Sequence, residues 1–248
     1  TNPLGNLGAG VQINSGANNR IGGTTAGDGN TIAFNAQDGI STSSGAVTDN
    51  AILGNSIFSN SGLGIDLAND GVTANDAGDG DSGPNELLNF PVFTSVSFSG
   101  GNATVNYDLD VPAGNYRVEF FVSAEPDTTG FGEGETLVGS DSIAHAGSGA
   151  ESFSTILTGV APGSILTATT SEDFGGGNYG SAVYLLTQRA TSLMAIRRAS
   201  TRLSSTKAAT VSFRSARRSR QPTTLPTERI PTTSASTSPA RDHIRSLW

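Results

Sequence analysis

A pattern of asparagine, isoleucine and glycine recurs at a spacing of 25 residues in the first third of the chain. It reads N-x-I-x-x-N-x-x-x-G-I, and its two copies align Asn30 with Asn55, Ile32 with Ile57, Asn35 with Asn60, Gly39 with Gly64 and Ile40 with Ile65. Segments this short cannot bury an apolar face alone. Stacked in register at about 4.8 Å they can, with Ile and Val pointing inward. We therefore expect parallel strands whose Asn amides hydrogen-bond from one layer to the next.

A second pattern, N-x-I-x-G, supports the same interpretation. It begins at Asn19 and again at Asn50, and an earlier copy of the Gly39-Ile40 segment begins at Gly10. About three coils are thus present in residues 1–92. Because stacks of repeats need about three repeats and a cap at each end, we expect further coils before Thr1 in the natural protein. The alternative is a disordered stretch rich in Gly and Asn.

These repeats resemble the right-handed parallel β-helix of bacterial surface and secreted proteins, the pectin-lyase-like superfamily. The resemblance covers residues 5–92, including the closing stretch from Asn60 to Val92. It implies a secreted or bacterial cell-surface location. The implied partner is a polysaccharide or a cell-surface glycan bound along the side of the helix.

In residues 93–186 the 25-residue repeat gives way to short runs in which apolar residues alternate. Six apolar-alternating runs are separated mostly by Gly, Pro, Asn or Asp, and they span 92–98, 103–109, 116–124, 136–143, 152–157 and 165–170. Such spacing is typical of an antiparallel sandwich. The stretch resembles the immunoglobulin-like modules that follow β-helices in surface proteins, although it has no Cys. The whole chain is therefore expected to be all-β, which fits its 32 Gly and its charged content of only 15%.

Residues 187–248 form a basic segment that we expect to be a disordered tail. Residues 1–180 carry 20 acidic and two basic residues, whereas residues 181–248 carry 12 basic and two acidic ones. Three interpretations remain open: a basic arm for nucleic acid or an anionic surface, a flexible linker, or translation in a shifted frame that begins near residues 181–186. Because Phe213 and Trp248 are its only aromatic residues, we do not expect the segment to bind single-stranded nucleic acid. No run of 18 apolar residues occurs, so we expect no membrane span.

An acidic loop between the repeats and the sandwich is the candidate metal site. It places several oxygen ligands within eleven residues, with Gly between them, namely Asn75, Asp76, Asp79, Asp81 and Asn85. Calcium takes about six to eight such ligands. The spacing loosely resembles the D-x-D-x-D-G calcium loops but lacks the Glu at their twelfth position. A solvated acidic turn that caps the coils is the alternative to calcium binding.

Catalysis finds less support in the sequence. Lyases of the resembled fold use calcium and a basic residue, for which Arg20 is the only candidate in residues 1–92. Asp66 and Asp70 are the candidate carboxylate pair of a glycosidase. Neither His145 nor His243 has a metal-ligand partner at helical or hairpin spacing. We therefore expect a non-enzymatic adhesive or scaffold role with glycan binding. The alternative is a polysaccharide lyase or glycoside hydrolase whose catalytic coils lie upstream.

Overall fold

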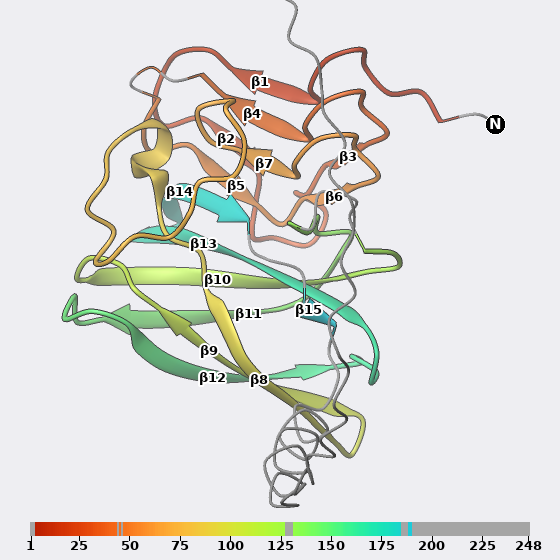
Figure 1. The fold of residues 1–248 in the computed structure, drawn as a ribbon, viewed down its shortest axis with the longest axis vertical. Helices are drawn as coiled ribbons and strands as arrows, with labels where there is room; N and C mark the ends of the chain where they lie inside the picture. The colour runs from red at the N-terminus through yellow and green to blue at the C-terminus, as the bar shows by residue number, and fades with distance from the viewer. Residues whose placement is uncertain (1–2, 44, 46, 127–130, 185–187, 190–248) are drawn as a thin grey trace, which may run out of the picture. The chain divides into compact units, whose positions relative to one another are not determined.

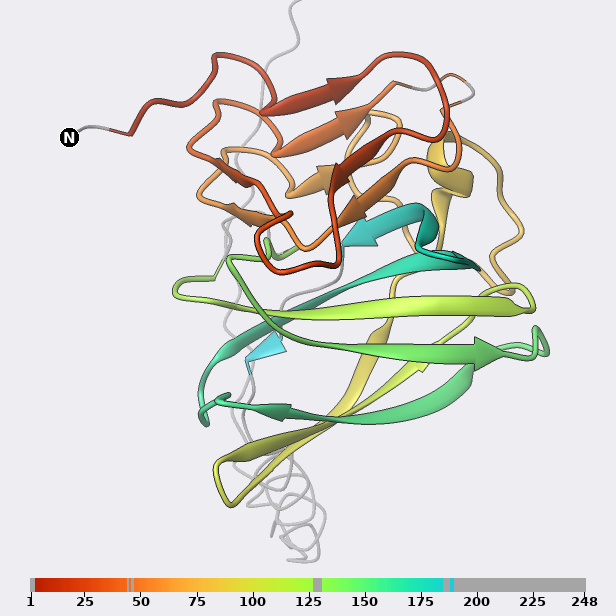
Figure 2. The same cartoon turned by 180° about the vertical axis from the view of Figure 1, so that it is seen from behind.

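Short parallel strands make up the first part of the chain. The computed structural model describes residues 3–43, 45, 47–126, 131–184 and 188–189. The parallel strands are β1 (Val11–Ile13), β2 (Arg20–Gly22), β3 (Thr31–Ala33), β4 (Ile40–Thr42), β5 (Ala51–Leu53), β6 (Ser56–Phe58) and β7 (Ile65–Asp66). They form three small stacks, β1-β4-β7, β2-β5 and β3-β6, seen from both sides in Figures 1 and 2. Ile32 lies opposite Ile57, and Ile40 opposite Ile65, as the 25-residue spacing predicts.

Isoleucine fills the interior of these stacks. Ile40 and Ile57 are fully buried, and Ile52 and Ile65 join them in one apolar cluster. One member of this cluster comes from far along the chain, since Phe121 also belongs to it and is 1% exposed. The interior of the parallel part is therefore closed by a side chain of the antiparallel part.

Asparagine ladders connect the layers, as the repeat predicts. The backbone N–H and the side-chain Nδ2 of Asn35 both donate to Oδ1 of Asn60, at 3.1 and 2.7 Å. The same double contact joins Asn19 to Asn50 and joins Asn30 to Asn55. In every case the earlier residue donates and the later residue accepts.

Side chains from later in the chain terminate the ladders. Asn60 donates its N–H and its Nδ2 to Oε1 of Glu133, at 3.1 and 2.7 Å. Asn50 donates in the same way to Oδ1 of Asn85, at 3.0 and 3.2 Å. Beside the third ladder, Gly54 donates its N–H to Oε2 of Glu119, at 2.8 Å. Asn85 and Glu133 thus stand where the next Asn oxygen of their ladders would lie, whereas Glu119 accepts from a backbone N–H beside the third ladder.

The second part of the chain is antiparallel. Its strands are β8 (Val92–Ser99), β9 (Asn102–Leu109), β10 (Gly114–Ser123), β11 (Thr136–His145), β12 (Glu151–Thr158), β13 (Ile165–Gly175), β14 (Asn178–Tyr184) and β15 (Gln188–Arg189). One sheet has the order β12-β9-β8, and the other has the order β11-β10-β13-β14 with β15 also paired to β13. The six predicted runs coincide with β8 to β13. The structure adds β14, and it adds β15 within the segment that we expected to be a disordered tail.

Two-residue pairing explains why β15 escapes detection in the sequence. Gln188 and Arg189 pair with Leu166 and Ile165 in antiparallel register. Backbone hydrogen bonds need no alternation of apolar side chains, so no periodicity marks this strand. The rest of the predicted tail, residues 190–248, lies outside the described residues, and its disorder remains a prediction.

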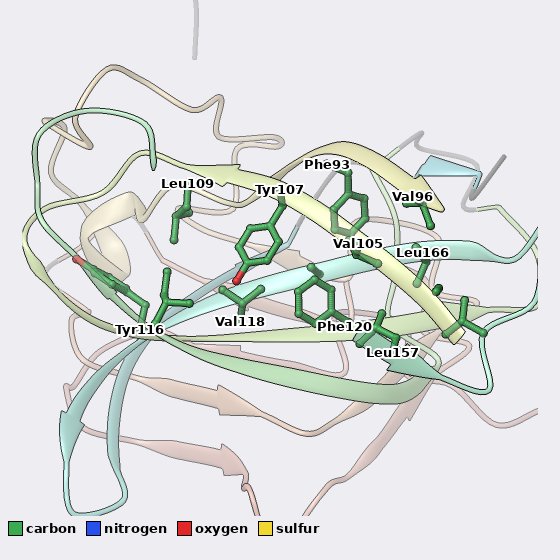
Figure 3. Close-up of a cluster of buried hydrophobic side chains, with 14 of the residues drawn as sticks. Phe93, Val96, Val105, Tyr107, Leu109, Tyr116, Val118, Phe120, Leu157 and Leu166 are labelled. Carbon is green, nitrogen blue, oxygen red and sulfur yellow. The ribbon is translucent and has the colours of Figure 1, made fainter. Parts of the chain in front are cut away.

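The two antiparallel sheets share one aromatic core (Figure 3). Tyr107 is fully buried and packs edge-on against Phe120, with ring centroids 5.5 Å apart. Phe93 stacks on the same Phe120 ring at 6.2 Å. The Tyr107 hydroxyl donates to Asp141 Oδ2 at 2.9 Å, which satisfies its one polar atom. These rings fix the spacing between the sheets.

Strand β10 is buried on both faces. Phe120 points into the core of the antiparallel part, whereas its neighbour Phe121 belongs to the cluster under the coils. Figure 1 shows the sheet that contains β10, β13 and β14 directly beneath the parallel strands β1 to β7, with β8, β9 and β12 on its far side. The sheet is therefore the middle of three layers.

Apart from its strands, the described part of the chain contains one short 3-10 helix, η1 (Pro84–Leu87). The described part of the chain has no helix with the length and apolarity that a membrane crossing requires. All described residues belong to one compact unit, Thr1–Ser205.

Candidate functional site

The acidic loop is closed at its base by two asparagines. Asn75 and Phe90 exchange two hydrogen bonds, Nδ2 to the Phe90 carbonyl at 2.7 Å and the Phe90 N–H to Oδ1 at 3.0 Å. Asn89 accepts from the Asp76 N–H and donates to the Asp76 carbonyl and the Asp110 carbonyl. These amide side chains join the two ends of the loop where paired strands would otherwise do so. They therefore hold residues 76 and 89 close together at the base of the loop.

Three aspartates converge within this loop. Carboxylate oxygens of Asp76, Asp79 and Asp81 lie within 4.8 Å of one another. Two of these carboxylates are held in place by backbone donors, since Gly80 N–H donates to Asp76 and Asn89 N–H donates to Asp79 Oδ1 at 2.6 Å. Hard cations such as calcium and magnesium prefer oxygen ligands of this kind.

The carboxylates of the loop are electrostatically strained. Burial raises the pKa of Asp79 to about 6, and repulsion from Asp81 and Asp76 adds to the rise while the Asn89 hydrogen bond opposes it. Burial and the charge of Asp76 also raise the pKa of Asp81. Both shifts arise first from burial and then from repulsion between the neighbouring negative charges, and a cation bound between the carboxylates would offset both causes.

The two asparagines predicted as ligands serve other groups. Asn75 holds the base of the loop through Phe90. Asn85 is completely buried and ends the ladder of Asn50, and its own Nδ2 donates to the Asn50 carbonyl at 2.9 Å. The structure therefore brings together three of the five predicted ligands as a carboxylate group.

A second acidic group lies where three distant segments meet. Carboxylate oxygens of Asp49, Glu86 and Glu172 lie within 4.8 Å of one another. Burial raises the pKa of Glu172 to about 7, followed in effect by repulsion from Glu86, Asp49 and Asp79. Sequence reasoning missed this group because its members are separated by 37 and 86 residues and share no motif.

The residues weighed for catalysis are engaged in local structure. Arg20 pairs with Asp28 at 3.2 Å and donates Nε to the Gly22 carbonyl, which holds a corner of the coil. Asp66 accepts from the N–H groups of Asp70 and Gly71, so Asp70 meets it through the backbone. Burial, ahead of the charge of Asp38, raises the pKa of Asp66 to about 6.

Of the two histidines, the structure describes His145. His145 is 4% exposed, with Nε2 3.0 Å from the Leu109 carbonyl and Nδ1 accepting from the Gly147 N–H at 3.0 Å. It therefore ties the end of β11 to the end of β9. His243 lies outside the described residues.

No protein-family model matches this chain, and a search of curated proteins finds no significant relative.

Proposed function

We propose that the chain is the closing part of a secreted or bacterial cell-surface protein, with residues 1–92 as the last coils of a right-handed parallel β-helix. Residues 93–186 would then form an immunoglobulin-like module that caps the helix. The parallel registers and the three Asn ladders support this assignment. The observation that carries it is the termination of the coils by Glu133, Asn85 and Glu119, because a cap of that kind is what a repeat stack requires.

The role that we propose is non-enzymatic: an adhesive or scaffold module that binds polysaccharide or cell-surface glycan. Arg20, Asp66 and His145 all hold backbone groups in place, which supports a structural use of these side chains. A stack of coils presents a long, regular side face, and sugars along a glycan repeat at a regular spacing too.

A glycan array combined with product analysis tests this function. Retention of the intact chain on one class of glycan, without new reducing ends or unsaturated products, is the expected result. Turnover of the retained glycan would instead support a lyase or hydrolase. Absence of retention on every glycan would contradict the adhesive role.

We further propose that the Asp76, Asp79 and Asp81 carboxylates bind calcium and so stabilise the loop beneath the coils. Their convergence and the raised pKa of Asp79 support this proposal, because a divalent cation would offset the repulsion. Backbone carbonyls of the loop and water would have to complete the coordination.

Thermal unfolding tests the calcium proposal directly. Millimolar calcium is expected to raise the melting temperature by roughly 3 to 6 °C, since a ligand that binds only the folded state stabilises it. The variant Asp79→Asn keeps an oxygen for the Asn89 N–H but is expected to lose the calcium effect. Asp108→Asn, on the exposed side of β9, is the matched control and should retain it. An unchanged melting temperature with calcium and with chelator would contradict the proposal.

A further inference from the structure

A cavity of about 300 Å³ lies where the last coil meets the connection between β10 and β11. Phe58 and Asn60 line it from the coil, Glu133 and Glu135 from the connection, and Ile165 from the start of β13. Figure 1 shows this connection passing beside β6. Two hydrogen bonds fix that approach, from Ile57 N–H to the Gly134 carbonyl and from Ser56 Oγ to the Glu135 carbonyl. These two bonds hold residues 134 and 135 of the connection against β6.

An aromatic pair extends one wall of the cavity onto the outer face of the coils. The rings of Phe58 and Phe34 meet edge to face, with centroids 5.5 Å apart. Phe34 comes from the coil above and is 45% exposed. An exposed aromatic face beside a cavity is a common feature of binding surfaces, because it gains burial only when something covers it.

Three carboxylates border the same cavity. Glu125, Glu133 and Glu135 all border the cavity, and its described lining residues include no Lys or Arg. Glu133 is fixed by Asn60, and Glu135 Oε2 accepts from the Ala124 N–H at 2.9 Å. The cavity thus combines an apolar wall with several fixed negative charges, which favour a cationic ligand.

We propose that this cavity and its Phe34–Phe58 wall bind one residue of a glycan that carries free amino groups. An amino sugar fits both walls: the apolar face of its pyranose ring would cover the phenyl rings, and its ammonium and hydroxyl groups would donate to the glutamates. The cavity volume is at the small end of ligand sites, about 300 to 1,000 Å³, which suits a single sugar unit. This assignment rests on the proposed glycan binding and names the class of glycan.

Calorimetric titration of the intact chain with a hexamer of β-1,4-linked glucosamine tests the proposal. We expect binding that weakens at least about tenfold when the hexamer is fully N-acetylated, because acetylation removes the charge-assisted hydrogen bonds. Salt at about 0.5 M should also weaken it, because the charges are partly exposed. Equal binding of the acetylated hexamer would overturn the proposal.

Two variants locate the site without disturbing the fold. Phe34→Ala and Glu125→Gln are each expected to lower the affinity at least about fivefold. Glu125→Gln should leave the melting temperature unchanged, whereas Phe34→Ala loses its contact with Phe58 and should lower it only slightly. Phe174→Ala and Glu151→Gln are the matched controls, because Phe174 is 57% exposed on β13 and Glu151 lies on β12. Equal loss in the controls, or no loss in the site variants, would overturn the assignment.

The outcomes separate this proposal from the broader one. If the chain binds another glycan with an affinity that the Phe34 and Glu125 variants leave unchanged, this cavity is excluded while adhesive function stands. If no glycan binds at all, both proposals fail. If a lysine-rich peptide binds and the glucosamine hexamer does not, the occupant is a basic peptide and the glycan assignment fails.

Discussion

At the scale of single residues, Glu133 shows how a carboxylate ends a ladder of amides. An Asn side chain both accepts from the coil above and donates to the coil below, so it extends the ladder. The carboxylate of Glu133 accepts from Asn60 in the same position, but an ionised carboxylate has no proton with which to continue. The difference of one functional group thus converts a repeating unit into an end.

Removal of this acceptor is expected to be costly. Glu133→Ala would leave the buried N–H of Asn60 and one of its two Nδ2 hydrogens without an acceptor, while Nδ2 keeps its bond to the Ile32 carbonyl. We therefore expect the free energy of unfolding to fall by about 2 to 4 kcal/mol. Urea unfolding measures it. Glu133→Gln keeps a carbonyl oxygen and should lose less than half as much. Glu125→Ala, exposed on the same connection, should change stability by no more than about 0.5 kcal/mol. Equal losses at both positions would contradict the capping role.

Raised carboxyl pKa values predict that stability falls as pH rises. The pKa of Asp79 and of Asp66 is about 6, and that of Glu172 about 7, all above their ordinary values near 4. In each case the folded state holds the proton more tightly than the unfolded state. The resulting stabilisation is complete below about pH 4 and is lost as pH rises through 6 to 7.

Melting curves in calcium-free buffer between about pH 4.5 and pH 7.5 measure this effect. We expect the melting temperature to fall by several degrees over that range. Glu172→Gln removes one titrating group and should flatten the curve, whereas Asp173→Asn, at the next position of β13, should not. A curve that rises with pH in the wild-type chain would contradict the assignment.

At the scale of elements, the parallel part was the most predictable. Ile32 and Ile57 pair because a repeat that stacks in register must place equivalent residues opposite one another. The ladder from Asn35 to Asn60 follows from the same equivalence. The antiparallel runs were predictable through their alternation, but β14 was not. Its sequence, Asn178 to Tyr184, starts directly after three glycines and shows no clear period.

Contacts between segments far apart in the chain could not be predicted from the sequence. Asp76, Asp79 and Asp81 are close in the chain, so their convergence was predictable from spacing alone. Asp49 and Glu172 meet only because the antiparallel part docks beneath the coils, and no local pattern records that docking. The sequence did not predict the hydrogen bonds of Glu119 and Glu133 for the same reason. A single Glu in a strand or loop has no sequence pattern that identifies its hydrogen-bond donor.

The substitution Asn60→Asp tests the ladder, because it replaces only the side-chain NH2 group by an oxygen. Asn60→Asp would place a carboxylate where Nδ2 of Asn60 now lies 2.7 Å from Glu133. Two buried carboxylates in contact repel unless they share a proton, so we expect a loss of about 3 kcal/mol at neutral pH. Urea unfolding at lower pH should show a partial recovery. Asn60→Ala also loses Nδ2, and in addition the Oδ1 that accepts from Asn35, but it introduces no repulsion, so its deficit should depend much less on pH. Identical pH profiles would contradict this geometry.

At the scale of the whole molecule, the middle sheet serves two cores at once. Phe120 and Phe121 are both buried although they point to opposite faces of β10. The coils therefore depend on the antiparallel part for both an apolar floor and ladder caps. A chain that ends at residue 91 is expected to lose its cooperative unfolding transition, because three short stacks cannot close their own interior.

Circular dichroism during urea titration distinguishes the outcomes. A chain that ends at residue 189 retains β14, β15 and every cap, so it should unfold cooperatively with nearly the stability of the full chain. The shorter chain should show a gradual, non-cooperative change. A sharp transition in the chain of 91 residues would show that the coils are autonomous.

The uniform direction of the asparagine ladders has a consequence for self-association. Because every rung donates toward the middle sheet, the lower end of the coils would present unpaired N–H groups to the surroundings. Such an edge behaves like the growing end of a polymer and would recruit strands from other copies. Glu119, Asn85 and Glu133 accept hydrogen bonds from donors at this end, and Nδ2 of Asn85 turns back to the Asn50 carbonyl instead of extending the ladder. The antiparallel part is therefore expected to prevent the addition of strands from other copies at that end.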